Sequence, residues 1–132
     1  MINLSHHSRF EMKSMLSNRR VPFQTLIISI NDTLREEHEI RNLCNVVGVS
    51  AFETFQFKDD EESFTPELAL KIKELVDSKF YLVDNIVVHC FAGVSRSAAV
   101  AKWINDYKGL DEKLYKDYKQ HNRHVYDVLC SV

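Results

Sequence analysis

Short runs of β-branched and apolar residues alternate along this chain with longer segments of helical periodicity. Phe55 and Phe57 alternate with Thr54 and Gln56, which is the period of a strand. Two further runs contain few polar residues and are typical of strands buried on both faces. These three expected strands lie at residues 25–30, 54–57 and 86–88, and Asn3 and Leu4 could begin an edge strand.

Helix signatures fill the intervals between these strands. Ser8 and Glu11 have the spacing of a capping box, in which each side chain bonds a first-turn amide. Thr65 is placed to cap another helix, with Pro66 at its first position. Further helices are expected at residues 33–45, 100–107, 114–119 and 125–129.

Strands separated by helices of this length form parallel βαβ units. We therefore predict an α/β fold: one three-layer domain over residues 1–132, with a mostly parallel central sheet of about four strands flanked by helices. Ligands of such sheets bind beyond the carboxyl ends of the strands. Two loops should lie there, at residues 58–62 and 89–97, and the second connects the last strand to the following helix.

Composition excludes several classes of protein. The length of 132 residues suits one domain, and 17 basic against 19 acidic residues do not suit a nucleic-acid binder. No apolar run reaches the roughly 20 residues of a membrane span, and the start of the chain lacks the apolar region of a signal peptide. We therefore expect a cytoplasmic protein with no membrane partner. Three cysteines do not suit a disulfide framework.

The loop at residues 89–97 reads His-Cys-Phe-Ala-Gly-Val-Ser-Arg-Ser and carries the candidate chemistry. A tight loop that enters a helix presents backbone amides, and about half a positive charge, to an anion. Gly93 permits a positive φ or a close backbone approach, and Arg96 can bind two phosphoryl oxygens at once. The same field favours the thiolate of Cys90. Ser97 can donate a hydrogen bond to that thiolate, and His89 can orient the loop through its ring nitrogens.

Taken singly, these residues have plainer interpretations. A cysteine at a strand end is usually a small buried apolar residue, and an arginine in a first helical turn usually faces solvent. Six residue types at fixed spacing, between a strand and a helix, favour the phosphate-binding interpretation.

This stretch resembles the His-Cys-x5-Arg-Ser/Thr signature of the protein tyrosine phosphatases. Its Ala-Gly-x-Ser-Arg-Ser ending is most similar to the small dual-specificity branch and to compact bacterial and phage members. The resemblance extends more weakly to the 28–32 segment, the Phe-x-Phe strand with its acidic loop, and residues 122–126. It implies a reaction without cofactor or metal, in which Cys90 forms a phosphocysteine while Arg96 and the amides of residues 91–96 hold the phosphoryl group.

The resemblance also implies a general acid, supplied by an aspartate on a loop upstream of the cysteine. Asp59 and Asp60 both fit that separation, and we prefer Asp59 because of its offset from the preceding strand. After the alcohol or phenol has left, the same carboxylate would act as base toward water. The alternative is that this acidic run is simply a solvated loop.

The variable positions of the loop bear on the substrate. They hold Phe91, Ala92, Val94 and Ser95, whereas relatives that act on inositol phosphates tend to carry lysines there. We therefore expect phosphorylated protein or peptide as substrate, with phosphate, sulfate or vanadate also binding in the loop. Phosphotyrosine is favoured, phosphoserine or phosphothreonine is accessible through a shallow pocket, and a phosphoinositide or an RNA 5′-phosphate is the weaker alternative.

Other functions remain open at this stage. A phosphate-binding module without turnover would share the loop but lack a working acid. A thiol redox enzyme, such as an arsenate reductase, would need Cys44 or Cys130 close to Cys90. His121 and His124 lack an obvious further ligand, so no metal site is expected. We interpret His6-His7 as a flexible polar end. We expect seven aromatic residues to belong to the core: Phe52, Phe55, Phe57, Phe64, Tyr81, Trp103 and Tyr107.

Overall fold

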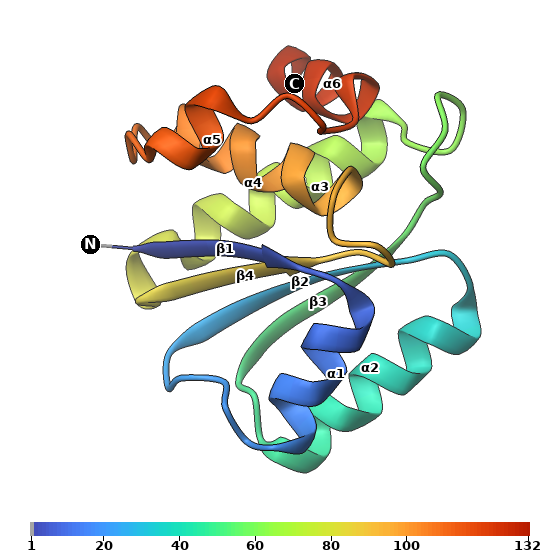
Figure 1. Ribbon diagram of the computed structural model, residues 1–132, viewed down its shortest axis with the longest axis vertical. Coiled ribbons are helices and arrows are strands. Elements are labelled where there is room, and N and C mark those ends of the chain that lie inside the picture. The colour runs from blue at the N-terminus through green and yellow to red at the C-terminus, as the bar shows by residue number, and fades with distance from the viewer. Residues whose placement is uncertain (1) are drawn as a thin grey trace.

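Four parallel strands form a twisted sheet between two layers of helices (Figure 1). The structure is a computed structural model that describes residues 2–132; residue 1 of the expected domain lies outside the described residues. The strands lie in the order β1-β4-β2-β3. Their bounds are β1 (Asn3–His7), β2 (Thr25–Asn31), β3 (Ala51–Gln56) and β4 (Asn85–His89). The α/β prediction is confirmed, and every strand pair is parallel.

The helices divide between the two faces of the sheet (Figure 1). One face is covered by α1 (Arg9–Ser17) and α2 (Leu34–Val47). The other is covered by α3 (Pro66–Lys79), α4 (Arg96–Tyr107), α5 (Lys113–Asp117) and α6 (Arg123–Ser131), with a short 3-10 turn, η1 (Phe80–Leu82), after α3. The predicted caps are present: Ser8 and Glu11 form a capping box, and Thr65 caps α3.

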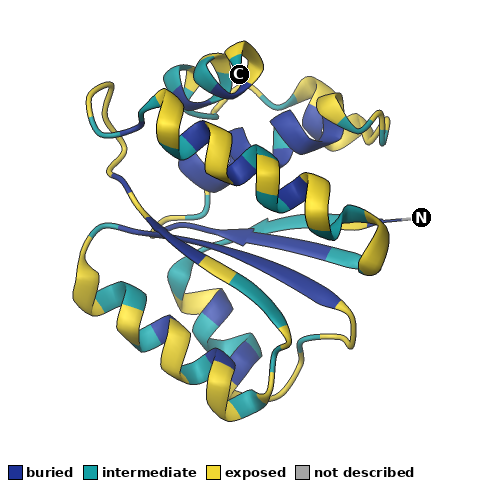
Figure 2. Ribbon diagram, turned by 180° about the vertical axis from the view of Figure 1, so that it is seen from behind, coloured by how far each residue is buried: buried dark blue, intermediate teal, exposed yellow. Residues whose placement is uncertain are grey.

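The core consists of two apolar clusters, one on each face of the sheet. Ile27 and Val87 pack toward α1 and α2, whereas Ile28 and Val88 pack toward α3 and α4. This alternation follows from the period of two along a strand. The two central strands, β2 and β4, are consequently almost fully buried, whereas the helices on both sides expose their outer faces (Figure 2).

Two expectations about single residues are wrong. His6 and His7 are not a flexible end, because they continue β1 in register with Val88 and His89 of β4. His6 also places Nδ1 2.9 Å from the Tyr115 hydroxyl. Tyr81 and Tyr107, two of the aromatic residues expected in the core, are 83% and 41% exposed and belong to neither core cluster.

The parallel arrangement brings the carboxyl ends of all four strands to one edge of the sheet. The loops from β1 to α1, β2 to α2, β3 to α3 and β4 to α4 therefore start at the same edge. No helix within residues 2–132 is both long and apolar enough to cross a membrane.

Candidate active site

The β4–α4 loop buries Cys90 at its base. The residue is 2% exposed, and its Sγ lies 3.1 Å from the Ser97 hydroxyl. The backbone N–H of Gly93 donates to the same sulfur at 3.3 Å. Because α4 begins at Arg96, the unpaired amides of its first turn lie where the loop meets the helix. The Gly93 amide and the Ser97 hydroxyl are thus two groups that can donate to the sulfur close to a helix N-terminus, where negative charge is favoured.

The junction of β1 and α1 supports the loop from behind. Gly93 has a φ of +74°, and a Cβ at this position would lie 2.4 Å from the backbone nitrogen of Ser8. The N–H of Cys90 donates to the carbonyl of His7 at 3.3 Å, and the N–H of Arg9 donates to the carbonyl of Phe91 at 3.0 Å. Only glycine allows an approach this close, so the sequence expectation for Gly93 has a definite geometric cause.

Arg96 is held by two acceptors from neighbouring strand ends. Its Nη1 donates to Asp32 Oδ1 at 2.6 Å and to the Phe57 carbonyl at 2.7 Å. The arginine is 5% exposed, and Asp32 directly follows β2. A buried guanidinium needs such partners, and here they fix the orientation of its plane.

His89 connects the loop to β2 through a buried chain of hydrogen bonds. Asn31 Nδ2 donates to Ser29 Oγ at 2.9 Å, and Ser29 Oγ lies 2.6 Å from His89 Nε2. His89 Nδ1 lies 3.4 Å from the Cys90 carbonyl, which can only accept. A neutral ring that donates from Nδ1 therefore uses Nε2 to accept from the Ser29 hydroxyl. Burial lowers the pKa of His89 to about 4, so the ring is neutral near pH 7. The His89 ring, which sequence analysis expected to orient the loop, thus contacts the Ser29 hydroxyl on one side and the Cys90 carbonyl on the other.

The two candidate aspartates lie in different environments. Asp59 Oδ1 accepts from the Ser95 hydroxyl at 2.9 Å, which brings this carboxylate to the rim of the β4–α4 loop. Asp60 Oδ1 instead accepts from the Ser63 hydroxyl at 2.6 Å and from the N–H of Glu62 and Ser63. These bonds within its own turn lower the pKa of Asp60 and direct it away from the cysteine loop.

Asn122 joins the Asp59 loop, the cysteine loop and α6. Its Nδ2 donates to Asp59 Oδ1 at 2.6 Å, its backbone N–H donates to the Ser95 carbonyl at 3.0 Å, and its Oδ1 caps α6 at Val125. Tyr118, in the same connection, donates its hydroxyl to the Val94 carbonyl at 2.8 Å. Burial, followed by the electrostatic effect of the nearby Cys90, raises the pKa of Tyr118.

The remaining candidates lie outside this arrangement. Cys44 packs among α1 and α2 on the opposite face of the sheet, where burial raises its pKa to about 11, and Cys130 is exposed on α6. His124 bonds the Phe64 carbonyl at 3.1 Å, and His121 packs on Tyr126. Within residues 2–132 no group of three or more potential metal ligands comes together.

Four residues of the site had no role assigned from sequence, although they lie within the 28–32 and 122–126 segments. Ser29 and Asn31 are polar positions on one face of an otherwise apolar buried strand, and that signal could have identified them. Asp32 follows the same strand end, which is where the fold places ligand-binding groups. Asn122 carries no comparable signal beyond its helix-capping residue type.

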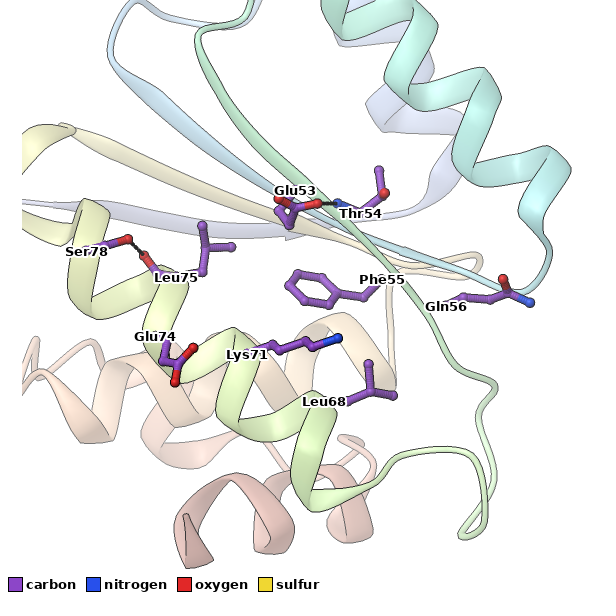
Figure 3. Close-up of a pocket in the computed structure, with 9 residues that line it drawn as sticks. All are labelled: Glu53, Thr54, Phe55, Gln56, Leu68, Lys71, Glu74, Leu75 and Ser78. Carbon is purple, nitrogen blue, oxygen red and sulfur yellow. Dashed lines mark hydrogen bonds between the residues drawn. The ribbon is translucent and has the colours of Figure 1, made fainter.

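A separate hollow lies between the edge strand β3 and α3 (Figure 3). It has a volume of about 680 Å³, and Phe55, Leu68 and Lys71 are among its lining residues. No residue of the cysteine loop lines it. Its lining mixes two carboxylates with one ammonium group and presents no nucleophile with a partnered base.

Comparison with solved structures identifies similar folds at low sequence identity. The crystal structure of Cydia pomonella PTP-2 phosphatase matches with a TM-score of 0.62 and 17% identity, over 98% of this chain and 84% of that one. Tk-PTP in the active form matches with a TM-score of 0.56 and 15% identity, over 98% and 90% of the two chains. The crystal structure of PTPMT1 matches with a TM-score of 0.56 and 15% identity, over 96% of this chain and 87% of that one. No family model and no curated protein matches the sequence.

Proposed function

We propose that this chain, which has the fold of PTP-type phosphatases, hydrolyses phosphomonoesters through a phosphocysteine intermediate, with phosphotyrosine in proteins as substrate and phosphoserine or phosphothreonine as further substrates. One observation carries the proposal: Cys90 Sγ lies at the base of a loop that enters a helix, between the Ser97 hydroxyl and the Gly93 amide. Arg96 stands at the end of that loop with its guanidinium already oriented.

In the first step, the Cys90 thiolate attacks phosphorus and the bond from phosphorus to the ester oxygen breaks. Arg96 and the loop amides hold the equatorial oxygens as charge develops on them. The departing oxygen takes a proton from Asp59. Because Oδ1 of Asp59 already accepts from Ser95 and Asn122, Oδ2 is the atom that carries this proton.

In the second step, water attacks the phosphocysteine and gives its proton to the ionised Asp59. The bond from sulfur to phosphorus breaks and inorganic phosphate is released. Sulfur leaves as a thiolate, which the Ser97 hydroxyl at 3.1 Å and the Gly93 amide at 3.3 Å stabilise. The reaction needs no cofactor, because nucleophile, acid and anion-binding groups all come from the chain.

The exposed part of the loop supports a protein substrate. Phe91 and Val94 are 61% and 41% exposed and carry no charge that would meet the additional phosphates of an inositol lipid. The net charge of −2 gives no general attraction for RNA. A phosphorylated side chain of a protein therefore fits this surface better than either alternative.

The test is hydrolysis of p-nitrophenyl phosphate in the presence of EDTA, by the wild type, Cys90→Ser, Asp59→Asn and Asp60→Asn. We expect turnover by the wild type that vanadate inhibits and none by Cys90→Ser. On phenyl phosphate, whose leaving group requires the acid, we expect a larger loss with Asp59→Asn than with Asp60→Asn. Activity that survives Cys90→Ser would refute the proposed mechanism. A folded, inactive wild type that vanadate still stabilises against melting would instead identify a phosphate-binding module.

A further inference from the structure

A groove runs from the cysteine loop along the outer face of α1. Its volume is about 550 Å³, and it is lined by Phe91 of the loop and by residues at the start of α1 and along it. The α1 residues Phe10, Lys13, Ser14 and Ser17 recur at i, i+3, i+4 and i+7, so they form one continuous helix face. The groove therefore has a defined direction, with one end at the residue that follows Cys90.

Two phenylalanines at this end are exposed to solvent. Phe10 is 81% exposed and Phe91 is 61% exposed, although the inner face of the same helix buries Met12 and Leu16 completely. Exposed aromatic side chains that line one groove are typical of a binding surface. Because the Phe91 carbonyl accepts from the N–H of Arg9, the rim of the groove is fixed relative to the nucleophile.

The cations of the groove are already paired. Arg9 forms salt bridges with Glu36 and Glu39, and its Nη1 also donates to Asn31 at 2.9 Å. Lys13 forms a salt bridge with Glu39 as well. Each cation of the groove therefore has a carboxylate partner, whereas the two aromatic rings have none and are free to pack on a ligand.

We propose that this groove, lined by Phe10 and Phe91, binds an apolar side chain next to the phosphotyrosine of a peptide substrate. The inference rests on the proposed function, because the phosphate must occupy the Cys90 loop while the neighbouring residue enters the groove. The helix face from residue 10 to residue 17 is about 10 Å long at 1.5 Å per residue, which matches about three residues of extended peptide. Substrates therefore carry apolar residues close to the phosphorylated tyrosine.

The test compares kcat/KM for two peptides, Ala-Leu-phosphotyrosine-Leu-Ala and Ala-Asn-phosphotyrosine-Asn-Ala. Leucine and asparagine are similar in shape and differ in polarity, so the ratio of the two values isolates apolar contact. We expect the wild type to prefer the leucine peptide about tenfold. The preference should fall to about twofold in Phe10→Ala, whose side chain is too exposed to matter for folding. Phe23→Ala, at an 88% exposed phenylalanine outside the groove, should keep the wild-type ratio.

Three results would overturn the inference. The first is equal kcat/KM for both peptides while p-nitrophenyl phosphate is still hydrolysed through Cys90. This result would refute the role of the groove in substrate binding and leave the proposed function intact. The second is a preference that Phe10→Ala and Phe23→Ala reduce equally. The third is faster, Phe10-dependent hydrolysis of a 5′-phosphorylated oligoadenylate, which would assign the groove to a nucleobase. Loss of Cys90-dependent turnover on every substrate would remove both proposals together.

Discussion

Asn122 offers the sharpest test of how the candidate acid is held. Its Nδ2 donates to Asp59 Oδ1 at 2.6 Å, and the Ser95 hydroxyl donates to the same oxygen at 2.9 Å. Asn122→Ser removes the first donor while a serine can still cap α6. A hydrogen bond in this solvent-exposed loop contributes about 1 kcal/mol. Its loss should therefore reduce acid catalysis about fivefold, and combining it with Ser95→Ala should reduce it about thirtyfold.

The effect should depend on the leaving group. Phenyl phosphate releases a phenolate whose conjugate acid has a pKa of about 10, so its departure requires a proton from Asp59. The nitro group of p-nitrophenyl phosphate stabilises the phenolate, and its release needs the acid far less. We therefore expect the fivefold and thirtyfold losses in kcat on phenyl phosphate, and changes below about twofold on p-nitrophenyl phosphate.

A double-mutant cycle provides the control. If Asn122 acts through Asp59, then Asn122→Ser should have no effect in an Asp59→Asn background. Equal losses on both substrates, or an undiminished fivefold loss in the Asp59→Asn background, would refute the reasoning. Asn122→Ala removes the cap as well as the donor, so the difference between the two Asn122 variants in melting temperature measures the structural contribution alone.

Three further predictions concern the loop and its supports. Gly93→Ala should lower the free energy of unfolding, measured by urea denaturation, by at least about 2 kcal/mol more than Gly109→Ala does. Both glycines have positive φ, but only at Gly93 would an added Cβ meet neighbouring backbone atoms. Equal losses would contradict this close approach. Asp32→Ala should raise the Ki for vanadate about tenfold, because Arg96 loses the acceptor that orients it. Asp32→Asn keeps an acceptor and should retain most of the vanadate affinity. Equal Ki values for the two variants would show that the charge of Asp32, rather than the orientation of Arg96, matters. Burial holds the pKa of His89 at about 4, against about 6.5 in the unfolded chain. Between these pH values the unfolded chain binds more protons, so the free energy of unfolding decreases as the pH falls. It should decrease by about 2 to 3 kcal/mol between pH 7 and pH 4.5, and His89→Gln should lack this part of the pH dependence.

Local patterns predicted the scaffold well because they act over short distances. The capping box of Ser8 with Glu11 and the Thr65-Pro66 start each fix a helix end through neighbouring atoms. The alternation of Phe55 and Phe57 with Gln56 predicted correctly which side chains are buried along and just after β3, and the helix expected at 125–129 lies within α6. The position of the cysteine loop followed from the parallel topology.

The contacts that complete the site depend on tertiary packing. Asp59 and Asp60 are adjacent and chemically identical, and only the turn through Ser63 determines which carboxylate reaches Ser95. Asp32 meets Arg96 across the sheet, and Asn122 meets Asp59 between loops that are 63 positions apart. No sequence period relates such residues, so spacing arguments could narrow the acid to two residues but could not predict its partners.

The seating of the cysteine loop against the β1–α1 junction has a consequence for synthesis on the ribosome. The carbonyl of His7 and the backbone of Ser8 are synthesised long before Gly93, and they can make these contacts only when a loop more than eighty residues later has been synthesised. Asn122 is synthesised later still, so a nascent chain contains Cys90 and its loop before it contains the residue that hydrogen-bonds the candidate acid, Asp59. Such a chain also lacks α6, whose Val125 and Leu129 belong to the same core cluster as Cys90. The scaffold that supports the cysteine loop is therefore completed only by the last helix to be synthesised.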